Sequence, residues 1–127
     1  WLHYAEGSVM PLLFLPLLFD RIEKRPMPFF ARPIAKKISE KTQNAFVKPQ
    51  LARHFEFLES ELTKSLWFAG ETFTAADIQM SFPLEAAVVR VGLDDRYPNL
   101  MKFLKRIQAR PAYQRAIARG GEFRILG

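Results

Sequence analysis

The sequence predicts an all-α fold, a bundle of five to six helices around one central buried helix. Apolar residues recur at spacings of three and four, which is typical of the inward face of a helix. Proline and glycine separate these stretches, and we find no convincing strand. A chain of 127 residues with 49% hydrophobic content suits one domain with a core. We therefore expect residues 1–127 to form a single helical domain.

The first helix is predicted to cover about residues 1–24. Pro11 and Pro16 should kink it, or split it near Gly7. Residues 9–19 read VMPLLFLPLLF, an unbroken apolar run of 11 residues. This run is shorter than the roughly 20 residues that span a membrane. It fits a buried core, an interface or the wall of a pocket.

The second helix is expected after a break at residues 25–30, RPMPFF. Pro33 fits its first turn. Ile34, Ile38 and possibly Ala45 are spaced for one face, with lysines on the other.

The third helix is predicted from about residue 50 to 65, after a bend or short break at Pro49. The spacing of its apolar residues predicts a buried face made of Leu51, Phe55, Leu58 and Leu62. Three charged residues should face water, namely Glu56, Glu59 and Lys64.

The central helix, about residues 74–91, begins with a capping signal. Thr74 is a hydroxyl N-cap and Asp77 lies three residues later, so that each side chain can reach the other's backbone N–H. Phe73 and Ile78 are placed to form a hydrophobic staple across this start. The helix is apolar almost all the way round, as expected in the middle of a bundle.

Two further helices follow. Pro83 should bend the central helix and Gly92 should end it, after which Pro98 and Pro111 each begin a helix. Glycines at 120–121 end the last one, and residues 121–127 are expected to be a tail. The predicted inward residues are Leu100, Phe103, Leu104, Ile107, Tyr113 and Ile117.

The net charge of +6 is uneven. Residues 21–48 hold 8 basic and 2 acidic side chains, and residues 102–119 hold 6 basic and no acidic ones. Basic helices can bind nucleic acid or membrane surfaces. Neither segment has a known nucleic-acid recognition motif or a set of aromatic residues for base stacking. We therefore expect the basic helix faces to be exposed to solvent, and we expect neither nucleic acid nor a membrane as a partner.

The residues alone indicate no catalytic group in this segment. There is no Cys, and His3 and His54 lie far apart without metal-ligand spacing, so no metal site is predicted. The serines have no nucleophile-elbow context, and no glycine-rich phosphate loop occurs.

Several motifs in order resemble the C-terminal helical domain of the cytosolic glutathione S-transferases. They are FAGETFTAADI at 68–78, Tyr-Pro at 97–98, Arg-Pro-Ala at 110–112 and Gly-Gly at 120–121. The resemblance covers nearly the whole chain. The stretches WLHYAEGS and PFFARPIAKKI are most similar to bacterial and fungal members.

The resemblance implies that the active site is divided between two domains. A thioredoxin-like domain upstream would hold glutathione, a co-substrate and not a tightly bound cofactor, together with the Tyr, Ser or Cys that activates its thiol. The helical domain would supply the wall of the pocket for a hydrophobic electrophile and the contacts of a homodimer. The implied protein is a cytoplasmic detoxification enzyme, and this segment alone would be inactive.

The first helix offers the best pocket candidates. Met10, Leu13, Phe14 and Leu17 fall at spacings of three and four and therefore share a face. They suit either the co-substrate pocket or the core. Tyr4 could place its hydroxyl toward the same site.

Glu6 is the candidate for a contact with the glutathione of the neighbouring subunit. In some family members an acidic residue of this helix reaches the glutathione amine of the partner. A surface or dimer salt bridge is the other reading of Glu6.

Two other functions stay open at this point. The domain could be a non-enzymatic interaction or regulatory module, as in elongation-factor gamma subunits, stringent-starvation regulators and assembly scaffolds. It could also belong to a relative with peroxidase, isomerase or dehalogenase activity.

Overall fold

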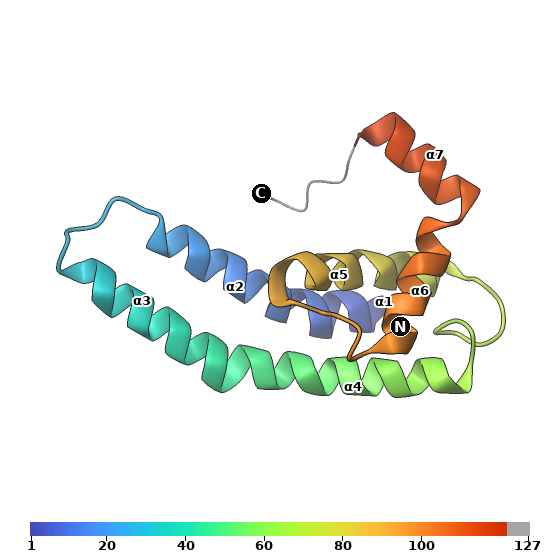
Figure 1. The fold of residues 1–127 in the computed structure, drawn as a ribbon, viewed down its shortest axis with the longest axis horizontal. Coiled ribbons are helices and arrows are strands. Elements are labelled where there is room, and N and C mark those ends of the chain that lie inside the picture. The colour runs from blue at the N-terminus through green and yellow to red at the C-terminus, as the bar shows by residue number, and fades with distance from the viewer. Residues whose placement is uncertain (122–127) are drawn as a thin grey trace.

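The computed structural model describes residues 1–121, and within that range every named element is helical, as predicted (Figure 1). Two long helical arms run side by side with three further helices around them. The first arm comprises α1 (Leu2–Tyr4), η1 (Ala5–Val9) and α2 (Met10–Glu23), and the second comprises α3 (Ala31–Thr42), η2 (Gln43–Val47) and α4 (Lys48–Lys64). The remaining helices are α5 (Ala75–Val91), α6 (Pro98–Gln108) and α7 (Pro111–Gly120).

Each arm contains one π-helical turn, η1 or η2, and each turn precedes a proline. A proline ring clashes with the carbonyl four residues before it. For Pro11 that carbonyl belongs to Gly7, and for Pro49 it belongs to Ala45, the middle residues of η1 and η2. The wider π turn relieves the clash without ending the helix. The second helix therefore continues through Pro49, and the short break considered there does not occur.

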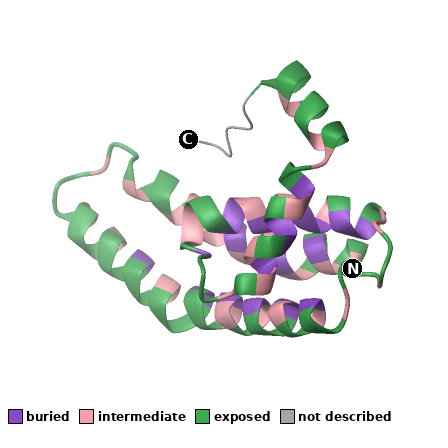
Figure 2. Ribbon diagram, turned by 45° about the vertical axis from the view of Figure 1, so that its right-hand side comes forward, coloured by how far each residue is buried: buried purple, intermediate pink, exposed green. Residues whose placement is uncertain are grey.

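The core lies where α5 meets the first arm, α4 and α6 (Figure 2). Met80, Leu84 and Ala87 of α5 are fully buried, which confirms α5 as the central helix. The predicted inner faces of α4 and α6 are also confirmed, because all eight of their residues are buried. They are Leu51, Phe55, Leu58, Leu62, Leu100, Phe103, Leu104 and Ile107.

The buried face of α3 differs from the prediction. Ile34 and Ile38 are 60% and 57% exposed, whereas Ser39 is buried and its hydroxyl accepts a hydrogen bond from Gln43 Nε2 at 3.1 Å. The reason is the position of α3, which with the end of α2 extends beyond the other helices (Figure 1). No described element covers the isoleucine face there.

Glu59 does not simply face water, as the sequence had suggested. Its two carboxylate oxygens accept the backbone N–H groups of Asn99 and Leu100 at 2.8 and 2.9 Å. These N–H groups belong to the first turn of α6, where helical N–H groups lack internal partners and favour a negative charge. Glu59 therefore caps α6 from α4.

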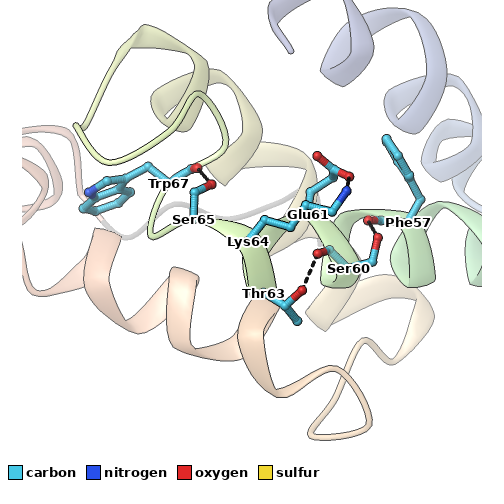
Figure 3. A network of polar contacts seen from close by, with 7 residues as sticks. All are labelled: Phe57, Ser60, Glu61, Thr63, Lys64, Ser65 and Trp67. Carbon is cyan, nitrogen blue, oxygen red and sulfur yellow. Dashed lines mark hydrogen bonds and ion pairs between the residues drawn. The ribbon is translucent and has the colours of Figure 1, made fainter.

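The end of α4 is held by short-range polar contacts (Figure 3). The hydroxyls of Ser60 and Thr63 donate to the carbonyls three residues earlier, at 2.7 and 2.6 Å. Ser65 leaves the helix in an extended conformation, and its hydroxyl donates to the Trp67 carbonyl at 2.8 Å. Trp67 and Gly70 then exchange two backbone hydrogen bonds in a tight turn, with Gly70 at a φ of 121°.

The last helix, α7, packs loosely against the rest of the described chain. Its predicted inward residues Tyr113 and Ile117 are half-buried, and none of its residues is fully buried. Of the predicted tail, residues 122–127 lie outside the described residues.

By length and composition alone, one helical stretch of the described chain, Leu2–Glu23, could cross a membrane. In the fold this stretch packs against α5 and buries Ala5, Val9 and Leu13 in the core. Only 17% of the apolar 18-residue window within this stretch is buried in the fold, and length and composition alone are weak evidence for a membrane span.

Candidate functional site

The residues of the predicted capping box at the start of the central helix are joined by hydrogen bonds. Thr74 and Asp77 make both bonds of a capping box, and Thr74 N–H donates to Asp77 Oδ2 at 2.8 Å. Thr74 Oγ1 also accepts from Ala76 N–H at 3.3 Å. The buried Asp77 carboxylate uses its other oxygen to accept Phe68 N–H at 2.9 Å. Asp77 thus joins the 67–70 turn to α5, a contact that the capping motif alone does not predict.

The hydrophobic staple does not bury both of its members. Phe73 is half-buried and packs edge-on against Trp67, with ring centroids 5.1 Å apart. Ile78 is 60% exposed, because the hollow that it lines with Phe73 is open to solvent. Phe73 and Ile78 therefore line the same hollow at the start of α5, and whether they form the predicted staple stays a prediction.

The four predicted pocket residues of the first helix do come together. They line a small hollow of about 70 Å³ between α2 and α5. Its residues are Met10, Leu13, Phe14 and Leu17 from α2, and Phe82, Ala86 and Arg90 from α5.

The residues that line this hollow differ in burial, and the difference distinguishes residues of the hydrophobic core from residues exposed on the wall of the hollow. Leu13 is only 3% exposed and belongs to the core, whereas Phe14 is 56% exposed and offers an open aromatic face. Met10 and Leu17 are half-buried between these extremes. The surface is apolar apart from Arg90, so it can hold an apolar group but supplies no acid or base for proton transfer at neutral pH.

Tyr4 lies elsewhere, which corrects its assignment to the same surface. Its hydroxyl forms a hydrogen bond with Nδ1 of His54 on α4, and its ring packs against Trp1 and Phe57. Burial raises the pKa of Tyr4 and lowers the pKa of His54, because both lose solvation of their charged forms. The neutral pair joins the first arm to the second.

Glu6 is exposed on η1 and accepts a hydrogen bond from the Gln79 side chain of α5. The bond fixes its carboxylate on the side of the first arm that faces α5.

Within residues 1–121, no group of three or more His, Asp or Glu side chains is placed to hold a metal ion. The described part of the candidate site consists of an apolar surface and one arginine, and the Tyr4–His54 pair lies apart from it.

Sequence reasoning missed the half of the hollow that α5 contributes. Phe82, Ala86 and Arg90 follow one another at intervals of four, which is a recognisable helical stripe. The stripe is hard to see in the sequence because α5 is apolar on most sides. The Tyr4–His54 pair joins residues 50 positions apart and has no local signal.

Comparison with known proteins gives consistent matches. The family described as "Glutathione S-transferase, C-terminal domain" matches residues 11–111. Glutathione S-transferase 1 of Saccharomyces cerevisiae is 31% identical over 97% of this chain and 55% of its own length. Glutathione S-transferase 3 of Schizosaccharomyces pombe is 29% identical over 88% of this chain and 46% of its own length.

A solved structure agrees. The crystal structure of a glutathione S-transferase from Actinobacillus pleuropneumoniae matches 93% of this chain with a TM-score of 0.63 and 25% sequence identity. The match covers 48% of that protein. The chain thus spans about half the length of the relatives it matches.

Proposed function

The chain belongs to the glutathione S-transferase family, and from this premise we propose that it is the helical half of an enzyme that conjugates glutathione to hydrophobic electrophiles. The other half would be a thioredoxin-like domain upstream that binds glutathione and activates its thiol. The proposed location of the whole enzyme is the cytoplasm, and its proposed role is detoxification.

The reaction needs little chemistry from this domain. The thiolate of glutathione is the nucleophile, and the residue that lowers its pKa would lie upstream. The helical domain would hold the electrophile beside the sulfur and exclude water. An apolar surface without acid or base groups suits that task.

The observation that carries the proposal is the α2–α5 hollow. It brings together Met10, Leu13, Phe14 and Leu17, and the exposed ring of Phe14 presents a flat apolar surface that Met10 can adapt to. The hollow is small in this chain, and we propose that the upstream domain completes its remaining wall.

We also propose that the enzyme is a homodimer in which the exposed face of the arms forms part of the contact. Leu18, Ile22, Ile34 and Ile38 are all at least 40% exposed on α2 and α3. Such a set of exposed apolar residues is typical of an interface. Glu6 is the proposed contact to the glutathione amine of the partner subunit.

The test is steady-state kinetics of the full-length protein with glutathione and a chloronitrobenzene. Phe14→Ala should raise the KM for the electrophile about tenfold, since losing the buried contact of one aromatic ring costs more than 1 kcal/mol. The KM for glutathione should change little. Val89→Ala is the matched control, because Val89 is an exposed apolar residue of α5, the other helix of the hollow, and does not line it.

Equal effects of Phe14→Ala and Val89→Ala would contradict the pocket assignment. If the full-length protein conjugates no electrophile but reduces hydroperoxides, isomerises or dehalogenates, the same domain serves another glutathione reaction. If it has no glutathione-dependent activity at all, the enzymatic proposal is wrong.

A further inference from the structure

The connection between α2 and α3, residues 24–30, forms the tip of the projecting ends of the two arms (Figure 1). The Pro28 carbonyl accepts the Ala31 N–H at 2.9 Å, so Phe29 and Phe30 occupy the two central positions of a tight turn. Phe30 is 66% exposed, and Phe29, at 88%, is the most exposed large apolar residue of the described chain. The two rings contact each other edge-on, with centroids 6.3 Å apart. The tip therefore presents a small aromatic surface to its surroundings.

Basic side chains flank this aromatic turn. Arg25 precedes it and Arg32 follows it, and both are exposed. Residues 20–41, which include the end of α2 and most of α3, hold seven basic and three acidic side chains, a net charge of +4. Two of the three acidic side chains are already paired with lysines in exposed ion pairs. The tip thus combines open aromatic rings with an excess of positive charge.

A hollow of about 190 Å³ lies beside the turn, between the end of α2 and the first turns of α3. It is lined by Glu23, Arg32, Pro33 and Lys36. Arg32 and Lys36 are four residues apart on one helix, so both cations can approach the same phosphate group. Lys36 is only loosely held by Glu40, at 3.8 Å, and Glu23 offsets one of the two charges. The hollow can therefore receive a phosphate at the edge of the aromatic tip.

The charge of the tip distinguishes between possible partners. A second copy of this chain that met it tip to tip would place two segments of charge +4 against each other, which is unfavourable. The dimer contact proposed above uses other residues, none of them in the turn. An anionic phospholipid surface supplies the opposite charge, and its headgroup layer favours aromatic rings. It also needs no preformed pocket to receive a convex tip.

We propose that the α2–α3 tip binds the surface of an anionic phospholipid membrane. Phe29 and Phe30 insert among the headgroups, while Arg25, Arg32 and Lys36 bind lipid phosphates. No sequence motif indicates this partner, because the turn and the exposure of its two rings become visible only in the fold. The tip shares no residue with the α2–α5 hollow, so this binding does not depend on the proposed transferase reaction.

The experiment is co-sedimentation of the full-length protein with sucrose-loaded vesicles, in the absence of glutathione. One set contains equal parts of phosphatidylcholine and phosphatidylglycerol, and the other contains phosphatidylcholine alone. The protein should sediment with the anionic vesicles and much less with the neutral ones. Raising NaCl from about 50 to about 500 mM should release most of it, because salt screens the attraction. Absence of binding to the anionic vesicles, or equal binding to both sets, would overturn the proposal.

Charge variants test whether the attraction is local to the tip. Arg32→Gln with Lys36→Gln should weaken binding to the anionic vesicles about thirtyfold, since each basic residue near such a surface adds to the attraction. Arg115→Gln with Arg119→Gln is the control, because it removes the same charge from exposed positions of α7, at the other end of the molecule (Figure 1). Equal weakening by both pairs would mean that only the overall positive charge matters and would refute the site.

Variants of the rings test the aromatic contribution. Phe29→Ser with Phe30→Ser should weaken vesicle binding about tenfold or more, because the apolar area that enters the headgroup layer is lost. Phe46→Ser with Val89→Ser is the control, since both residues are exposed and apolar but lie outside the turn. Circular dichroism checks that each variant is folded. A folded tip variant that binds vesicles as tightly as the parent would overturn the proposal.

Insertion of the tip can also be followed directly. Phe29→Trp places a fluorescent ring at the turn, and lipids brominated on their acyl chains quench tryptophan fluorescence only at close range. The variant should be quenched by brominated anionic vesicles more strongly than the parent, whose tryptophans are Trp1 and Trp67. Equal quenching of variant and parent would mean that the ring stays outside the lipid layer, and would refute insertion by the tip.

Discussion

The region formed by α4, α5 and α6 and the projecting ends of α2 and α3 use similar apolar residues in opposite ways. In the first region, residues such as Leu58, Leu84 and Leu100 are entirely buried. At the projecting ends, Ile34 and Ile38 are more than half exposed, and Phe29 in the connecting loop is 88% exposed. The residue types are alike, so the difference lies in what covers them.

This contrast shows that the spacing of apolar residues identifies a helix face that must be buried. It does not identify the element or partner that buries this face. The central helices find it within the chain. The projecting ends do not find it among the described residues, and the chain spans about half the length of its relatives. We therefore expect substitutions in the two regions to affect different properties, namely folding stability in the first and association in the second.

Asp77→Ala should have the largest effect on stability, about 3 kcal/mol of unfolding free energy. It leaves the N–H groups of Phe68 and Thr74 without their partner and removes a helix cap. Urea unfolding followed by circular dichroism measures the loss. Asp95→Ala, at an exposed loop position, should change stability by less than about 0.5 kcal/mol. Similar midpoints for the two variants would contradict the role of Asp77.

Glu59→Ala should cost less, about 1–2 kcal/mol, because it removes the cap that α4 provides for the start of α6. The same unfolding experiment applies. Glu56→Ala on the exposed side of α4 is the control and should be close to neutral. If both substitutions are neutral, water replaces the Glu59 carboxylate at no cost and α6 needs no cap.

The opposite behaviour is expected at the projecting ends. The isolated 127-residue chain should self-associate, because Phe14 and Leu18 of the 9–19 run and the isoleucine face of α3 are exposed. Ile34→Ser with Ile38→Ser should reduce this association while changing unfolding free energy by less than about 1 kcal/mol. Sedimentation at increasing concentration measures it. A monomeric parent chain at high concentration would be evidence against an interface here.

The Tyr4–His54 pair links the two arms. It should make the smallest contribution to folding stability, and this contribution should depend on pH. Burial lowers the pKa of His54 in the folded state, so the unfolded state binds a proton first as the pH falls. Stability should be complete above the ordinary histidine pKa of about 6.5 and decline as the pH falls through the lower, folded value. Urea midpoints between pH 5 and 8 measure it, and His54→Gln should flatten this part of the profile. An unchanged slope in the variant would assign the dependence to other groups.

The sequence was sufficient for local features and insufficient for distant ones. The inner faces of α4 and α6 and the cap of α5 follow from neighbouring residues, and the structure has them as predicted. Glu59 reaches N–H groups 40 residues away, and Tyr4 reaches a histidine 50 residues away, so neither contact leaves a local pattern. For the candidate site, spacing grouped the four α2 residues correctly but could not supply their partners on α5.

The π turns have a consequence for how the arms tolerate change. In each arm, the residues at every fourth position face the rest of the domain. An α-helix has about 3.6 residues per turn, so such a row should drift around the helix by ~40° per step. The rows are Trp1, Ala5, Val9, Leu13 and Leu17 in the first arm, and Ala31, Ala35, Ser39, Gln43, Val47, Leu51 and Phe55 in the second. A wider turn in the middle of each row offsets part of this drift, so the angular phase is reset once along the arm. Deleting a single residue from η2 would let this segment close as an α turn, because a π turn closes its hydrogen bond one residue further along than an α turn, and α4 would keep its core face. Deleting a residue from the regular part of α3 would instead rotate α4 against the start of α3 by ~100°, and the core residues beyond the deletion would point toward water.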